Sequence, residues 1–203
     1  MKLYYSPGAC SLAPHIALLE AGLPFELERV DLQSKRTEKG KDYLAINPKG
    51  YVPALELDSG EILTEAQIVL QYIAELKPEA KLAPSGGVVE RFRMLEMLNF
   101  ISTELHKQFG PLFRQNTPQE TRDYQVELIS KRIGLLEGRL PEGSFAASDR
   151  FSIADIYLFT ILNWTRPLKM DLGAWPRVRA YMGRISERPA VLSALRGEGL
   201  IPS

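Results

Sequence analysis

Cys10 is the only cysteine of the 203-residue sequence, and its thiol is a candidate for chemistry. It follows a short β-prone run and a loop that contains Gly8, and apolar residues recur at helical spacing from that point. Unpaired amide groups and the dipole at the start of a helix favour an anion, so this position predicts a stabilised thiolate. The alternative is a buried cysteine that packs as a small hydrophobic residue.

A single thiol needs a partner from outside the chain. The string CSLAP, which begins at Cys10, is similar to a dithiol redox motif in which Ala13 has replaced the second cysteine. One thiol cannot resolve its own disulfide, so a small intracellular thiol such as glutathione is the expected partner. A lone cysteine also excludes a structural zinc site built on paired cysteines, and we expect no metal.

Two segments of the first half suit a peptide ligand. Val52 and Pro53 begin a predicted strand, where a cis peptide bond would turn the Val52 backbone outward to pair with a tripeptide. A proline that merely starts an edge strand explains this pair equally well. At Thr64-Glu65-Ala66 a strand gives way to a helix, where free amides could hold a carboxylate and Glu65 an ammonium group. Taken alone, Glu65 is a first-turn residue favoured by the helix dipole.

A polar stripe lies on one predicted helix of the second half. Asn99, Thr103 and His106 stand at positions i, i+4 and i+7 between apolar neighbours, which places them along one helix face. His106 could donate a hydrogen bond to a thiolate or act as an acid or base, and a solvated face is the alternative. His15, on the first helix, is predicted to be a packing or surface residue.

The elements that position these residues form two regions. Residues 1–77 predict an α/β unit, whose strand, helix, strand, weak helix, hairpin and helix lie near 2–5, 10–22, 25–30, 43–47, 52–64 and 65–76. Residues 78–87 are rich in proline and glycine and predict an exposed linker. Residues 88–203 keep three-to-four spacing without β-type alternation, so they predict an all-helical domain.

Two further features bear on stability and location. Ser152 and Asp155 form a capping-box variant at the start of a late helix, with a structural role. The 25 Lys and Arg residues balance 25 Asp and Glu residues, so neither nucleic acid nor an anionic membrane is an expected partner. The apolar stretch Ile156–Thr165 is too short to span a bilayer, and the N-terminus lacks a signal-peptide run, so we expect a cytoplasmic location.

Five strings, in order along essentially the whole chain, resemble the bacterial beta-class glutathione S-transferases. They are YYSPGACS, GYVPAL, TEA, NFISTELHK and SIADIYLF. The resemblance implies a thioredoxin-like domain in residues 1–77 and a helical bundle in residues 88–203 that carries a hydrophobic substrate pocket. It also implies a homodimer, with glutathione bound between the two domains and the partner chain contributing to the site.

The resemblance also assigns roles to single residues. Cys10 is the residue near the glutathione sulfur, able to form a mixed disulfide with it, and His106 is the second candidate catalytic residue. Lys35 holds the glycyl carboxylate, and Glu65 with Ala66 holds the γ-glutamyl end. The full set implied to bind glutathione is Cys10, Lys35, Val52, Glu65, Ala66, Asn99, Thr103, Glu104, Leu105 and His106.

Some positions depart from the pattern of the family. Ala66 stands where these enzymes often have serine, so only its backbone amide remains as a donor. Thr103 stands where similar proteins have serine, and it keeps the hydroxyl. Tyr5 and Ser11 also lie near enough in sequence to donate a hydrogen bond to the glutathione sulfur, so the identity of that donor stays open.

The implied activity is conjugation of the glutathione thiolate to a hydrophobic electrophile. A thiol-disulfide oxidoreductase or peroxidase acting through a Cys10 mixed disulfide is the first alternative. A non-catalytic carrier of hydrophobic ligands is the second, although a carrier needs neither Cys10 nor His106. The expected partners are glutathione, a small hydrophobic electrophile and a second copy of the chain.

Overall fold

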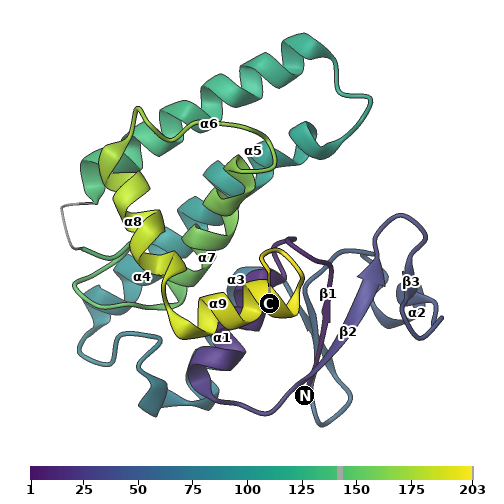
Figure 1. The fold of residues 1–203 in the computed structure, drawn as a ribbon. Coiled ribbons are helices and arrows are strands. Elements are labelled where there is room, and N and C mark those ends of the chain that lie inside the picture. The colour runs from purple at the N-terminus through teal and green to yellow at the C-terminus, as the bar shows by residue number, and fades with distance from the viewer. Residues whose placement is uncertain (141–143, 203) are drawn as a thin grey trace. The chain divides into compact units, whose positions relative to one another are not determined.

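The computed structural model describes residues 1–140 and 144–202 (Figure 1). The chain divides into two compact units. The first unit joins Met1–Ala83 with Arg188–Ser203, and the second is Pro84–Glu187. Among the described residues, no helix is both long enough and apolar enough to cross a membrane.

The first unit is built on a five-stranded sheet in the order β3-β2-β1-β4-β5. The strands are β1 (Lys2–Tyr5), β2 (Glu26–Asp31), β3 (Arg36–Thr37), β4 (Ala54–Glu56) and β5 (Ile62–Thr64). β1 pairs in parallel with β2, and the other pairs are antiparallel. Because a parallel pair needs a crossover, α1 lies between β1 and β2 in the chain. The predicted hairpin is confirmed as β4 and β5, whereas the short β3 was not predicted.

Four helices and one 3₁₀ turn complete the first unit. They are α1 (Leu12–Ala21), α2 (Tyr43–Ile46), α3 (Ala66–Leu76), η1 (Pro78–Ala80) and α9 (Pro189–Gly197). α1 ends at Gly22, whose left-handed conformation (φ 62°) lets its amide reach the carbonyls of Leu18 and Leu19. α1 packs on both α3 and α9, which explains why nearly all of its residues are buried.

The C-terminal segment differs from the expected division of the chain. Residues 88–203 were predicted as one helical domain, but Arg188–Ser203 belongs to the first unit. There α9 packs against α1, as Figure 1 shows, and the Arg188 guanidinium binds both carboxylate oxygens of Glu20 at 2.7 and 2.9 Å. The helical pattern of α9 is local, whereas its packing partner lies far away in the sequence.

The named secondary-structure elements in the described part of the second unit are all helical. Its elements are α4 (Val88–Phe100), the π-helix η2 (Ile101–His106), α5 (Lys107–Phe109), the 3₁₀ turn η3 (Gly110–Phe113), α6 (Gln119–Arg139), α7 (Ile153–Leu162), the 3₁₀ turn η4 (Asn163–Thr165) and α8 (Pro176–Ser186). α7 is buried along its whole length and forms the centre of this unit. The predicted capping box at its start is confirmed: Ala154 N–H donates to Ser152 Oγ at 3.3 Å and Ser152 N–H to Asp155 Oδ2 at 2.9 Å.

Candidate active site

Cys10 lies in the loop between β1 and α1, just before the helix begins at Leu12. Its thiol donates a hydrogen bond to the carbonyl oxygen of Val52, with 3.1 Å between Sγ and oxygen. The loop is closed by Ser11, whose hydroxyl oxygen accepts the Ser6 amide at 3.1 Å and whose proton goes to the Ser6 carbonyl at 3.3 Å. Ser11 is therefore occupied within the loop, which weakens its candidacy as a donor to the glutathione sulfur.

The ionisation of Cys10 differs from the sequence-based prediction. The pKa of the Cys10 thiol is raised to about 12, chiefly by desolvation on burial and to a lesser extent by the negative charge of Glu65, while the backbone amides of Cys10 and Ser11 oppose the rise. The expected thiolate is therefore wrong: near neutral pH the side chain is a thiol that donates to Val52. The amides at the helix start are present, but desolvation outweighs them.

The Val52-Pro53 peptide bond is cis, which decides between the two interpretations that the sequence left equally open. Two side chains hold the residue before Val52 in place: the Tyr51 carbonyl accepts hydrogen bonds from Tyr43 Oη and Asn47 Nδ2, both at 2.8 Å. Tyr43 and Val52 also belong to one buried hydrophobic cluster, together with Tyr4, Val30 and Ala54. Packing thus holds the Val52 carbonyl against the Cys10 thiol.

Glu65 precedes α3 in a conformation that L-residues rarely adopt, with φ 69° and ψ 112°. Its carboxylate is exposed and accepts the Lys49 ammonium at 2.7 Å, and the same ammonium reaches Thr64 Oγ1 at 3.0 Å. Backbone strain of this kind concentrates at functional sites. Ala66 follows as the first residue of α3 and is buried.

Lys35 also has a left-handed backbone, with φ 57°. Its ammonium donates to the Gly50 carbonyl at 2.8 Å and stands 5.8 Å from the centre of the Tyr51 ring. Three of the predicted residues therefore contact the segment 49–52. Lys35 donates a hydrogen bond to the Gly50 carbonyl, Cys10 donates one to the Val52 carbonyl, and Glu65 forms an ion pair with Lys49. Sequence reasoning missed Lys49, although a lysine directly before the Gly50–Pro53 string was a usable signal.

The remaining predicted residues belong to the second unit. Asn99 is exposed on α4, and Thr103 is exposed on η2 with its hydroxyl donating to the Asn99 carbonyl at 3.0 Å. Glu104 accepts the Arg132 guanidinium at 2.7 Å, and the Leu105 side chain is fully buried. The polar stripe thus begins near the end of α4 and continues onto the π-helix η2, and the buried Leu105 offers a ligand only its backbone.

His106 ends the π-helix and lies among aromatic rings. Its Nδ1 is 2.7 Å from the hydroxyl of Tyr157, and its ring meets Trp164 edge to face at a centroid distance of 4.9 Å. Trp164 makes similar contacts with Phe109 and Phe113. His106 is half-buried and held by side chains, rather than on a freely solvated face.

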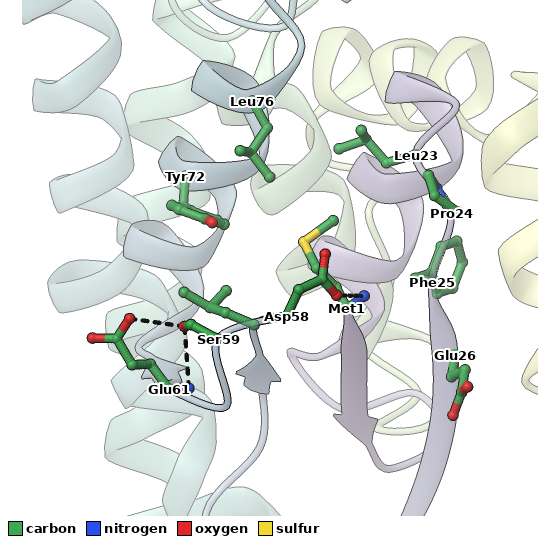
Figure 2. A pocket seen from close by; sticks show the side chains of 11 residues that line it. Met1, Leu23, Pro24, Phe25, Glu26, Asp58, Ser59, Glu61, Tyr72 and Leu76 are labelled. Carbon is green, nitrogen blue, oxygen red and sulfur yellow. Dashed lines mark hydrogen bonds and ion pairs between the residues drawn. The ribbon is translucent and has the colours of Figure 1, made fainter.

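A pocket of about 850 Å³ opens elsewhere in the first unit (Figure 2). It is lined by Met1, Leu23, Pro24, Phe25, Glu26, Leu57, Asp58, Ser59, Glu61, Tyr72 and Leu76. The Met1 ammonium group in this pocket pairs with Asp58 at 2.7 Å. Met1 precedes the start of β1, whereas Cys10 follows the end of that strand. This pocket contains no residue of the predicted site. The described part of the chain also holds no group of three or more His, Cys, Asp or Glu side chains placed to bind a metal ion.

The sequence was compared with known protein families. Residues 8–76 match "Glutathione S-transferase, N-terminal domain" and residues 100–189 match "Glutathione S-transferase, C-terminal domain". The chain belongs to the glutathione S-transferase family. Its membership confirms the predicted fold class, a thioredoxin-like domain followed by a helical domain, and the predicted class of enzyme, a glutathione transferase.

Individual members agree with this assignment. Glutathione S-transferase GstA of Escherichia coli O157:H7 is 46% identical, with 98% of this chain and 100% of that protein covered. A glutathione transferase structure from Methylococcus capsulatus is 55% identical with a TM-score of 0.96, over 98% of this chain and 99% of that one. The bacterial beta-class enzyme of Sphingomonas chungbukensis is 47% identical with a TM-score of 0.95, over 99% and 100%. The resemblance to the beta class is confirmed.

Proposed function

We propose that this glutathione transferase binds reduced glutathione along the segment 49–53 and transfers the glutathione thiolate to a hydrophobic electrophile. The observation that carries the proposal is the hydrogen bond from Cys10 Sγ to the Val52 carbonyl, at 3.1 Å. It places a thiol donor beside the strand edge where a tripeptide would pair its own backbone.

Charges around this edge match the two ends of glutathione. Lys35 supplies an ammonium group for the glycyl carboxylate, and Glu65 with the Ala66 amide receives the γ-glutamyl end. Lys35 now binds a backbone carbonyl and Glu65 binds Lys49, so both side chains exchange partners when the ligand enters. In the second unit, the resemblance to the beta class assigns Asn99 and the run Thr103–His106 to glutathione binding.

The state of Cys10 favours conjugation over thiol redox chemistry. A thiol with its pKa raised by burial to about 12 is a poor nucleophile near neutral pH, because the thiolate is the reactive form. The same thiol can donate its proton in a hydrogen bond to the glutathione sulfur. Glutathione then loses its own thiol proton to solvent, its sulfur forms a bond to the electrophilic carbon, and a leaving group departs with its electron pair.

The proposal includes a hydrophobic electrophile pocket in the helical unit, a homodimer and a cytoplasmic location. Support for the homodimer comes from α4, where Val88, Val89 and Phe92 are all more than 60% exposed, as is Tyr51 in the first unit. Exposed apolar residues that are adjacent on one helix face commonly mark a protein contact. Light scattering coupled to size exclusion tests the dimer, and a monomer at micromolar concentration contradicts it.

Two assays on purified protein test the function. Calorimetry should show glutathione binding, and the protein should release chloride from a chlorodinitrobenzene in the presence of glutathione. The Cys10→Ala variant should keep most of the conjugation. If conjugation is absent while glutathione-dependent disulfide reduction is present and vanishes in Cys10→Ala, the redox alternative is correct. Glutathione binding without turnover of electrophiles, peroxides or disulfides indicates the carrier.

A further inference from the structure

We propose that Tyr157 is a positioning residue that holds neutral His106 in the tautomer with its proton on Nε2. The inference rests on the proposed function, because it assigns His106 a role in the transferase site. Tyr157 Oη lies 2.7 Å from His106 Nδ1, and the two residues come from α7 and η2 of the same unit.

The chemistry of the two groups decides which one donates. A phenol is a stronger acid than neutral imidazole, and an imidazole nitrogen is a stronger base than a phenol oxygen. The favoured arrangement is therefore Tyr157 O–H donating to Nδ1 of His106. The 2.7 Å separation agrees, since hydroxyl donors typically sit about 2.7–2.8 Å from their acceptors and N–H donors about 2.9–3.0 Å. A neutral imidazole that accepts at Nδ1 carries its proton on Nε2.

The second histidine of the chain provides an internal contrast. His15 Nδ1 lies 2.9 Å from Glu198 Oε1, and the other oxygen of that carboxylate accepts the Gly8 amide at 2.8 Å. An ionised carboxylate only accepts hydrogen bonds, so His15 Nδ1 carries a proton. The two imidazoles are thus held in opposite ways, one as a donor at Nδ1 and the other as an acceptor there.

Aromatic packing fixes the plane of the His106 ring, and the hydroxyl selects its orientation within that plane. Trp164 meets the ring at an interplanar angle of 70° and Tyr157 at 84°. Both partners are at most 9% exposed. A 180° rotation of the imidazole would keep these edge-to-face contacts but would put a carbon where Nδ1 now accepts the Tyr157 proton. The Tyr157 hydroxyl thus distinguishes the two orientations.

The support for Tyr157 is a rigid element. α7 is buried along its length, and the capping box of Ser152 and Asp155 holds its start. Asp155 also accepts the Ala146 amide at 2.7 Å and the Tyr181 hydroxyl at 3.0 Å. Positioning of a functional side chain is most precise when a packed helix holds its partner.

The assignment narrows the role of His106. With its proton on Nε2, the neutral ring offers that atom as a hydrogen-bond donor and cannot accept a proton there. His106 would stabilise the glutathione thiolate by donating a hydrogen bond rather than remove the thiol proton as a general base.

Nitrogen-15 spectra of the labelled protein, without glutathione, test the tautomer directly. At about pH 9, where imidazoles are ordinarily neutral, His106 should show an acceptor-type Nδ1 and a protonated Nε2, with the His15 pattern reversed. A His106→Gln variant assigns the signals. In Tyr157→Phe the two His106 nitrogen shifts should move toward averaged values. Thr160→Val is the matched control, because it removes a hydroxyl on the same helix that donates to the Ile156 carbonyl at 2.9 Å.

Kinetics provide the second readout. Tyr157→Phe should lower kcat for a chlorodinitrobenzene about 2- to 10-fold, the range expected for one neutral hydrogen bond, with little change in KM for glutathione. Thr160→Val should leave both constants unchanged. The proposal is overturned by a protonated Nδ1 on wild-type His106, or by a Tyr157→Phe variant with unchanged shifts or unchanged kcat.

The two readouts separate the possible failures. If wild-type protein shows the expected shifts but conjugates nothing, the proposed function fails and the tautomer assignment stands. If Tyr157→Phe does not fold, the shifts of wild-type His106 decide the tautomer alone, and a protonated Nδ1 there still overturns the proposal.

Discussion

The carboxylate of Glu198 holds the amide of Gly8 at 2.8 Å, so the end of the chain supports the loop that carries Cys10. The two residues are 190 positions apart, and the other carboxylate oxygen binds His15 on α1. Gly8 has φ 71°, and a Cβ atom there would come within 3.3 Å of Leu200. The C-terminal segment therefore stabilises the conformation of the loop that carries Cys10.

Replacing Glu198 should destabilise the protein. Glu198→Ala leaves the Gly8 amide and the His15 ring without their buried acceptor, at a cost of about 2–4 kcal/mol in the free energy of unfolding. Urea denaturation measures this loss. Glu187→Ala, at an exposed position, is the control and should change stability by less than about 0.5 kcal/mol. If Glu198→Ala lowers the free energy of unfolding by no more than the control does, Glu198 does not stabilise the loop that carries Cys10.

Cys10 should react slowly with alkylating agents. With its pKa raised to about 12 by burial, the thiolate fraction near neutral pH is roughly a thousandfold below that of an ordinary thiol. The rate at which iodoacetamide alkylates Cys10 in the folded protein should keep rising with pH beyond the pH at which the same rate reaches its plateau in urea-unfolded protein. A plateau of the folded protein below about pH 9 would show that the thiolate is stabilised after all.

The same shift predicts a pH dependence of stability. Because folding raises the pKa of Cys10 from 9.0 to about 12, the unfolded chain releases this proton first as pH rises. The contribution of protonated Cys10 to the free energy of unfolding is complete below about pH 9 and is lost progressively toward pH 12. Cys10→Ala should therefore flatten the fall in the free energy of unfolding over this window. Parallel curves for the two proteins would contradict the shift.

Lys35→Met should weaken glutathione binding. The variant keeps the length of the side chain but removes the ammonium group proposed for the glycyl carboxylate, and a charge-assisted hydrogen bond corresponds to about 10- to 100-fold in KM for glutathione. Initial rates at varied glutathione measure the effect. Lys41→Met, at an exposed position of the same unit, is the control. Equal KM values for both variants would remove Lys35 from the site.

Glu65→Gln tests the other end of the ligand. The amide keeps the shape of the side chain but loses the charge proposed to receive the γ-glutamyl ammonium group, so KM for glutathione should rise about tenfold or more. Folding should be little affected, because the ion pair with Lys49 is exposed. Glu61→Gln on the neighbouring hairpin is the control. An unchanged KM in Glu65→Gln would contradict the proposal that the Glu65 carboxylate binds the γ-glutamyl ammonium group.

Much of the first unit and the outline of the site followed from local patterns. The Gly22 cap, the hairpin of β4 and β5 and, in the second unit, the capping box of Ser152 each depend on residues a few positions apart. The residues around Pro53 left a cis bond and a plain edge strand equally open, and the structure shows the cis bond. The short strand β3 was missed because two residues show no alternation. The π-helical turn at Ile101–His106 was also missed, since its residues carry an ordinary helical pattern.

The sequence by itself determined the order of the elements, the family and the residues with suitable chemistry. Tertiary structure alone decided how those residues behave. Cys10 meets Val52 across 42 positions, His106 meets Tyr157 across 51, and His15 meets Glu198 across 183. Burial and hydrogen-bond partners set the protonation of a side chain, and both depend on atoms that no local spacing brings together. For that reason the sequence located the thiol at the helix start but predicted the wrong charge for it.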